Sequence, residues 1–196
     1  MPIADSSAVK DTKRILAQHQ SALTLLQLIV SDPSLTKVEW LDLACGRGQI
    51  MLALEENLTP VARAKIIYNA YDADPRYLRE TEKTASGLGF AAIKTKIGDL
   101  ESFSLLADAA VVFDFVTFTN TAHEVRPSVL AKLLVDVVLR LSPRGYLFVY
   151  DMEYINPPEL GAIAWSSAEF ASIVKTLTKS LGNLCTSRLD AVENVV

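Results

Sequence analysis

The chain has 196 residues, of which 50% are hydrophobic and 21% are charged, and its formal net charge is −4. This length and composition suffice for one packed α/β domain with a sizeable core. An acidic chain with scattered lysines and arginines lacks the general electrostatic attraction that dominates nucleic-acid binding. Nucleic acid is therefore disfavoured as a partner.

Local features disfavour a membrane segment and a zinc site. The apolar-rich run over residues 22–30 is too short to span a membrane, and the first residues lack the pattern of a signal peptide. Cys45 and Cys185 form no Cys-x-x-Cys pair, and two histidines cannot complete a usual zinc set with them. We expect a cytoplasmic protein with free thiols and no bound metal.

Helices and strands are predicted in alternation along the chain. Apolar residues at helical spacing predict a first helix over 7–31, which we expect to form a cap, residues 1–35, on a domain of residues 36–196. Strands are predicted at 38–43, 65–71, 91–97, 109–118 and 146–150, and helices at 48–58, 75–88, 127–141 and 167–181. The connection 99–108 leaves room for one helical turn or none. Such alternation predicts a parallel sheet with helices on both faces.

The most informative stretch is residues 40–48, which read Trp-Leu-Asp-Leu-Ala-Cys-Gly-Arg-Gly. An apolar strand runs into a turn of small residues, and a helical segment follows, as in the unit that holds nucleotide-like cofactors. Glycines let the backbone approach a ligand closely, and the free N–H groups at a helix start receive its polar groups. Tight packing of a strand against a helix is the alternative interpretation of this turn.

Acidic residues follow the second and third predicted strands. Asp72 lies 24 residues after Gly48 and could accept hydrogen bonds from both ribose hydroxyls. Its alternative role is a helix N-cap, but Asp74, directly before Pro75, fits that role better. Asp99 could accept the exocyclic amine of adenine, with Leu100 against the ring, or could be an ordinary turn residue.

Five motifs, in this order, resemble those of the class I S-adenosylmethionine-dependent methyltransferases over residues 38–182. They are residues 41–48, 71–74, 97–100, 113–116 with His123 and Glu124 beyond them, and 143–148. The resemblance implies S-adenosylmethionine as cofactor and a Rossmann-like three-layer α/β/α sandwich with a mostly parallel sheet. Such domains usually end in an antiparallel strand pair. Here a strand fits at 184–189, but a further one has little room, so the pair is shortened, trimmed or completed by a partner.

The resemblance also implies roles for ten positions. The turn residues Asp42, Ala44, Gly46 and Gly48 would hold the methionine part of the cofactor, although Ala44 stands where the family often has its first glycine. The ribose would lie on Asp72 and the adenine beside Ala73, Asp99 and Leu100. The backbone around Thr119 and Asn120 would face the amino group of the cofactor and the departing methyl group.

His123 and Glu124 are the candidate catalytic residues, because they lie just beyond the fourth strand on the substrate side of the resembling fold. A general base needs a suitable pKa and reach to the proton of the substrate. The alternative is a structural histidine at a helix start, satisfied by backbone. No second histidine follows at helical spacing, so this is no zinc-protease motif.

Two other segments receive weaker interpretations. Residues 156–159, Asn-Pro-Pro-Glu, resemble the signature of amino-group DNA methyltransferases, but they follow the fifth strand and lack its aromatic residue, which favours a rigid loop. Asp151, Met152 and Glu153 end the fifth strand, and with Tyr154, Trp165 and the N-terminal helix they could form a lid over a small acceptor. Trp165 equally suits a core position.

From these features we expect an S-adenosylmethionine-dependent methyltransferase with a small-molecule acceptor, a protein side chain being the second choice. In-line displacement at a sulfonium methyl depends on positioning, so no fixed catalytic residue is required. The alternative from another class is a non-catalytic module that binds the cofactor or a partner. A nicotinamide dehydrogenase is disfavoured because Met51 stands where its turn requires a third glycine.

Overall fold

A single parallel sheet organises the chain, for which the computed structural model describes residues 17–108, 110–155 and 161–181. Its strands are β1 (Val38–Leu43), β2 (Ile66–Asp72), β3 (Ala92–Ile97), β4 (Phe113–Thr119) and β5 (Leu141–Tyr150). They lie in the order β3-β2-β1-β4-β5, and every neighbouring pair is parallel. The predicted α/β fold with a parallel sheet is thus confirmed.

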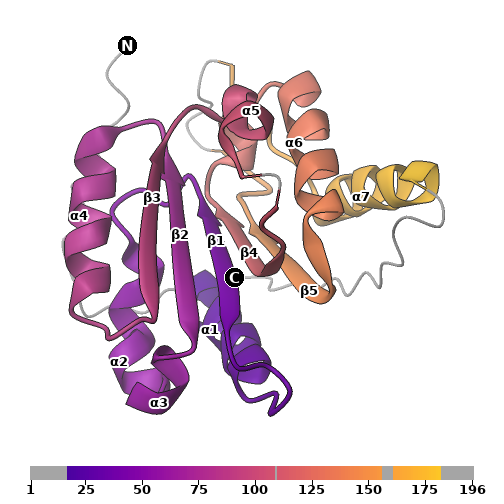
Figure 1. Cartoon of the computed structure of the whole chain (residues 1–196). Coiled ribbons are helices and arrows are strands. Elements are labelled where there is room, and N and C mark those ends of the chain that lie inside the picture. Colours follow the sequence, from indigo (N-terminus) through magenta and orange to yellow (C-terminus); the bar gives the residue numbers. More distant parts are fainter. Residues whose placement is uncertain (1–16, 109, 156–160, 182–196) are drawn as a thin grey trace.

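Helices cover both faces of this sheet (Figure 1). The chain order is α1 (Ala17–Val30), η2 (Gln49–Ala53), α2 (Leu54–Asn57), α3 (Pro60–Arg63), α4 (Pro75–Ser86), η3 (Leu100–Ser102), α5 (Phe103–Leu106), η4 (Ala122–Glu124), α6 (Pro127–Leu139) and α7 (Ser167–Leu181). In the part of the chain that the structure describes, no helix is long and apolar enough to cross a membrane.

Two hydrophobic clusters bury the central strands β1, β2 and β4 on both faces, whereas the edge strands β3 and β5 contain no fully buried residue. Alternate residues of β1 point to opposite sides, so that Trp40 joins one cluster and Leu41 the other. The first cluster packs α1, η2, α2 and α4 against the sheet, and the second packs α5, α6 and α7 against it. The result is a three-layer sandwich, in which α1 is part of one layer. The boundary between a cap and a domain at residue 35 stays a prediction.

Several element bounds differ from the sequence-based expectations. The helix predicted at 48–58 is a 3₁₀ turn, η2, followed by the single turn α2, and the one-turn helix α3 was not predicted. The strand expected from residue 109 begins at Phe113, and β5 begins at Leu141 rather than at residue 146. The turn predicted at 143–145 lies within β5 and shifts the register of its pairing with β4. Phe113 pairs with Leu141, but Phe115, two residues later, pairs with Tyr146. The strand predicted at 184–189 and the loop 156–159 lie outside the described residues.

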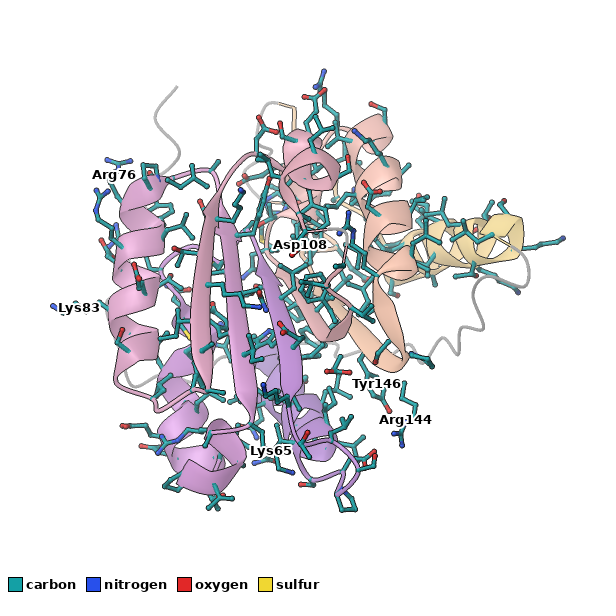
Figure 2. The ribbon with its side chains drawn as sticks, in the orientation of Figure 1. Lys65, Arg76, Lys83, Asp108, Arg144 and Tyr146 are labelled. Carbon is teal, nitrogen blue, oxygen red and sulfur yellow. The ribbon has the colours of Figure 1, made fainter. Side chains whose placement is uncertain are left out.

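Parallel strands bring all their carboxyl ends to one edge of the sheet, where ligands bind in open α/β folds. In Figure 2, Arg76 at the start of α4 marks this edge at the top of the view. Lys65, which precedes β2, and Arg144, early in β5, mark the opposite edge at the bottom. Most of the residues discussed next lie at or just beyond the carboxyl ends of these strands.

Candidate functional site

The turn after β1 has three residues in the left-handed region of backbone space. The φ angles are 51° at Ala44, 53° at Gly46 and 72° at Gly48. A Cβ on Gly48 would lie 2.5 Å from the Cε atom of Met51, whereas a Cβ on Gly46 would meet nothing within 4 Å. The alanine in this conformation costs about 1–2 kcal/mol, so the turn stores backbone strain beside open space at Gly46.

Asp72 binds this turn to the end of β2. Its Oδ2 atom accepts the Gly46 N–H at 2.9 Å, and its Oδ1 atom accepts the Asp74 N–H at 2.8 Å. The residue is 9% exposed, and Ala73 beside it is exposed. Asp74 is the N-cap of α4, since its carboxylate accepts the Arg76 N–H at 2.7 Å. The N-cap role thus falls to Asp74, and contact of Asp72 with a ribose stays a prediction.

Asp42 lies beneath the turn with its carboxylate inside the protein. It is 2% exposed, and it accepts hydrogen bonds from the Tyr68 hydroxyl at 2.7 Å and the Thr117 hydroxyl at 2.6 Å. Burial raises the pKa of Asp42 to about 6, with the charge of Asp72 adding to it, while the two hydroxyl donors act against this rise. The carboxylate thus links the end of β1 to β2 and β4 through these two hydroxyl groups.

Cys45, in the same turn, is a free and buried thiol. Burial, with the charges of Asp42 and Asp72, raises its thiol pKa far above the usual range. The cysteine is therefore a packing residue rather than a nucleophile, because the thiolate is the reactive form.

The carboxylates of Asp42 and Asp72 have no cationic partner within the described part of the chain. Every ion pair found there, at up to 4.0 Å, involves other acids. Nor does any group of three or more histidine, cysteine or acidic residues in these ranges have a geometry for a metal ion. This half of the site thus concentrates negative charge that a cationic ligand would balance.

Asp99 has the turn role that was its alternative. It is the N-cap of η3, accepting the Ser102 N–H at 2.8 Å, and its carbonyl accepts the Tyr71 hydroxyl at 2.7 Å. Burial, helped by the Asp99 charge, raises the pKa of Tyr71 to about 12. Leu100 is half-buried against the second cluster. Contact of Asp99 and Leu100 with adenine stays a prediction.

A second strained residue follows β4. Asn120 has φ 53°, and its N–H donates to the Tyr150 carbonyl at 2.8 Å, while Thr119 is half-buried. Because β1 and β4 are neighbours, the left-handed residues Ala44 and Asn120 follow adjacent strands at the same edge. Strain of this kind clusters at ligand sites.

His123 and Asp151 form a buried pair across the ends of β4 and β5. The His123 Nδ1 atom lies 2.5 Å from Asp151 Oδ1, and the His123 backbone N–H donates to Oδ2 at 2.8 Å. The side chains are 4% and 7% exposed. The alternative interpretation was a structural histidine whose ring bonds to backbone groups. The ring instead bonds to the carboxylate of Asp151. Sequence reasoning assigned Asp151 only to a lid, since 28 residues separate the pair and only the β4–β5 pairing brings them together.

The proposed lid residues divide between surface and core. Tyr154 is 77% exposed, whereas Trp165 packs against the second hydrophobic cluster. The Trp165 Nε1 atom is buried and has no hydrogen-bond partner in the described residues. Trp165 is therefore half-buried against the core, which is nearer to its alternative interpretation than to an exposed lid.

No protein-family model matches the sequence, and no curated protein matches it either. Many solved structures do match. The plantazolicin methyltransferase BpumL, solved with a substrate analog and SAH, is 17% identical at TM-score 0.65, over 91% of this chain and 70% of that one. The magnesium protoporphyrin IX methyltransferase of Synechocystis PCC 6803, solved with bound SAM, is 14% identical at TM-score 0.56, over 82% and 68%.

Other matching structures are longer than this chain. The chain spans about half of the O-methyltransferase family protein from Burkholderia thailandensis, covering 52% of it and matching over 82% of its own length, at 13% identity and TM-score 0.56. At these identities the likeness shows a shared fold. The chain has the Rossmann-like fold of the class I methyltransferases, as the motifs predicted.

Proposed function

We propose that this chain binds S-adenosylmethionine and transfers its methyl group to a small-molecule acceptor. The observation that carries the proposal is the strained turn after β1, whose Gly46 N–H is held by the Asp72 carboxylate at 2.9 Å. It lies at the carboxyl edge of a parallel sheet, where such folds bind ligands. The fold of the solved methyltransferases supports the same conclusion.

The residues present fit this cofactor. Its sulfonium and ammonium groups are cationic, and the part of the site at the ends of β1 and β2 holds Asp42 and Asp72 without a protein cation among the described residues. Asp72 uses one N–H donor on each carboxylate oxygen, so each oxygen keeps a lone pair for a ribose hydroxyl. A phosphate in the same place would be repelled.

The reaction requires positioning more than side-chain chemistry. When bound, the cofactor supplies a methyl group on a positively charged sulfur. We expect Asp42 to support the turn from below, Asp72 to orient the ribose, and the backbone at Thr119 and Asn120 to face the reacting end. Holding two reactants in line in this way replaces a bimolecular encounter and accounts for several orders of magnitude in rate.

A small-molecule acceptor is favoured by the matching proteins, which are methyltransferases of plantazolicin and of magnesium protoporphyrin IX. A protein side chain is the second choice. The expected cytoplasmic location also stays a prediction.

Calorimetric titration with S-adenosylmethionine and S-adenosylhomocysteine, with NAD as control, tests the proposal. We expect micromolar binding of the first two and none of NAD. A folded sample that binds neither cofactor would overturn the proposal and leave the turn as architecture. Binding without turnover on any acceptor would instead support a non-catalytic module.

A further inference from the structure

The flank pocket, where η2 and α2 meet the end of α4, lies away from the carboxyl edge of the sheet (Figure 1). It has a volume of about 200 Å³, and its lining residues are Met51, Leu52, Glu55, Thr84, Gly87 and Leu88. Ligand pockets usually measure about 300–1,000 Å³, so this one suits a small ligand. None of the residues assigned above to the cofactor or to catalysis lines it.

The lining of the flank pocket is apolar inside and negatively charged at its rim. Met51 and Leu88 are buried, and Leu52 adds an exposed apolar wall. The rim holds the exposed carboxylate of Glu55 and the C-terminal end of α4, a helix of 12 residues. The unpaired carbonyl groups at such a helix end carry partial negative charge. This lining fits a small compound that has an apolar body and a cationic head with N–H donors.

The cations of the protein leave room for such a head group. Arg63 is the ion-pair partner of Glu55, but its Nη1 atom lies 3.7 Å from Glu55 Oε1, which is beyond hydrogen-bond distance. Lys83, in the last turn of α4, is exposed and points away from the fold in Figure 2. Neither side chain lines the flank pocket. The Glu55 carboxylate therefore keeps lone pairs for a closer donor.

Both walls of the flank pocket are connected to the turn after β1. On one wall, the Met51 N–H donates to the Gly48 carbonyl at 3.0 Å, and the Met51 Cε atom would lie 2.5 Å from a Cβ on Gly48. On the other wall, Thr81 lies one helical turn before Thr84 and donates its hydroxyl to the Gly46 carbonyl at 2.8 Å. A ligand in the pocket therefore contacts the two elements that hold the turn.

The segment η2, which carries Met51, has a conformation that can change. It is a 3₁₀ helix over Gln49–Ala53, and such helices have poorer hydrogen-bond geometry than α-helices and rarely exceed about 3–4 residues. The chain continues directly as the α-helix α2 from Leu54. A change between the two helical forms would move Met51 relative to Gly48 without breaking the chain. η2 is therefore the element through which occupancy of the flank pocket reaches the turn.

We propose that the flank pocket binds a small ammonium compound with an apolar body, and that its occupancy tightens ligand binding at the turn after β1. The second part rests on the proposed function, because the affinity that changes is that for S-adenosylmethionine. A bound compound confines Met51 against Gly48, so the turn loses less conformational freedom when the cofactor binds. The coupling is reciprocal, and the cofactor tightens binding of the ammonium compound by the same factor.

Carbon-13 spectra of protein labelled at the methionine methyl groups test the binding directly. The chain has three methionines, and Met152, which is 39% exposed and follows β5, is the internal control for Met51. Cyclohexylammonium should shift the Met51 signal at about millimolar concentration, as expected for so small a ligand, and should leave Met152 unchanged. Cyclohexanecarboxylate has the same body and the opposite charge, and it should shift neither. An unchanged Met51 signal with the ammonium compound, or an equal shift with the carboxylate, would overturn the proposal.

Glu55→Gln and Glu56→Gln are matched variants, because both acids lie on α2 and Glu55 lines the flank pocket whereas Glu56 does not. Glu55→Gln should weaken binding of cyclohexylammonium by about 3–5-fold, as expected for loss of an exposed ion pair. Glu56→Gln should leave it unchanged. Equal affinities of the two variants would show that Glu55 does not bind the head group, and the assigned class of ligand would be wrong.

Calorimetric titration with S-adenosylmethionine, with and without saturating cyclohexylammonium, tests the coupling. We expect the cofactor affinity to rise by about 5-fold with the ammonium compound present. Thr81→Val, which removes the hydrogen bond to the Gly46 carbonyl, should reduce this rise while the Met51 shift persists. Unchanged or weaker cofactor binding would overturn the coupling. If S-adenosylmethionine does not bind at all, the proposed function fails, whereas the Met51 signal still decides whether the flank pocket binds the ammonium compound.

Discussion

The two halves of the candidate site hold their acidic residues in opposite ways. In the turn half, at the ends of β1 and β2, Asp42 and Asp72 accept hydrogen bonds from hydroxyl and backbone N–H groups, with no cation beside them among the described residues. In the pair half, at the ends of β4 and β5, Asp151 has the imidazole of His123 as its partner. One half has no basic side chain beside its acids among the described residues, whereas in the other a histidine lies against the acid.

This difference indicates what each half is for. Acids that lack a protein cation are costly when buried, and they are stabilised when a cationic ligand arrives. An acid that already has a histidine gains nothing from such a ligand and instead fixes that histidine. The turn half therefore suits the constant cofactor, and the pair half suits the chemistry of a particular acceptor.

The charge at Asp42 gives the largest expected effect. Its pKa is about 6 in the folded protein and 3.8 in a model peptide, so the folded state holds the proton more tightly. The resulting stabilisation is complete below about pH 3.8 and is lost as the pH rises through about 6. Relative to Asp42→Asn, which cannot titrate there, the unsubstituted protein should lose about 2.5 kcal/mol of unfolding free energy between pH 4 and pH 7.5.

Urea unfolding of both proteins across this pH range measures the change. Tyr68→Phe, which removes one hydroxyl donor from the carboxylate, should make the pH dependence steeper, because that donor opposes the rise in the pKa of Asp42. If the unfolding free energies of the unsubstituted protein and Asp42→Asn depend on pH in the same way, burial does not raise the pKa of Asp42. The proposed difference between the two halves of the site would then be wrong.

The ligand role of the turn half is tested by Asp72→Ala. Loss of charge-assisted hydrogen bonds should weaken S-adenosylmethionine binding by about 1–3 kcal/mol, and the turn also loses the acceptor of the Gly46 N–H. Calorimetry on the folded variant measures the affinity. Asp74→Ala is the matched control: it removes the N-cap of α4 and should lower the melting temperature by about 2–4 °C, with the affinity unchanged. Equal affinities of the two variants for S-adenosylmethionine would mean that Asp72 does not bind the cofactor.

The sequence predicted the turn half better than the pair half, for a physical reason. A glycine turn and the acid after the next strand are local patterns, so Gly46, Gly48, Asp72 and the N-cap Asp74 could all be placed from spacing. The partner of His123 depends on β4 lying beside β5, a long-range pairing with a shifted register that no local pattern records. For the same reason, η2 and α3 were misjudged, since one-turn helices depend on tertiary packing rather than on periodicity.

The two tryptophans of the chain extend the contrast to the two hydrophobic clusters. Trp40 is 0% exposed, packs on Tyr68 with ring centroids 4.8 Å apart, and donates its Nε1–H to the Thr117 hydroxyl at 2.9 Å. Trp40→Phe removes this hydrogen bond and leaves a gap under the turn half. We expect a loss of about 1–3 kcal/mol in urea unfolding. A loss near zero would mean that the hydroxyl network around Asp42 does not depend on the indole.

Trp165→Phe gives the smallest expected effect and completes the comparison. The Trp165 Nε1 atom is buried without a hydrogen-bond partner in the described residues, so the substitution removes an unsatisfied polar group while it removes some apolar contact. The two effects have opposite signs, because an unmade buried hydrogen bond costs free energy comparable to the lost packing. The change in unfolding free energy should stay within about 1 kcal/mol, below that of Trp40→Phe under the same conditions. A loss larger than that of Trp40→Phe would show that Trp165 contributes more to the second cluster than Trp40 contributes to the first.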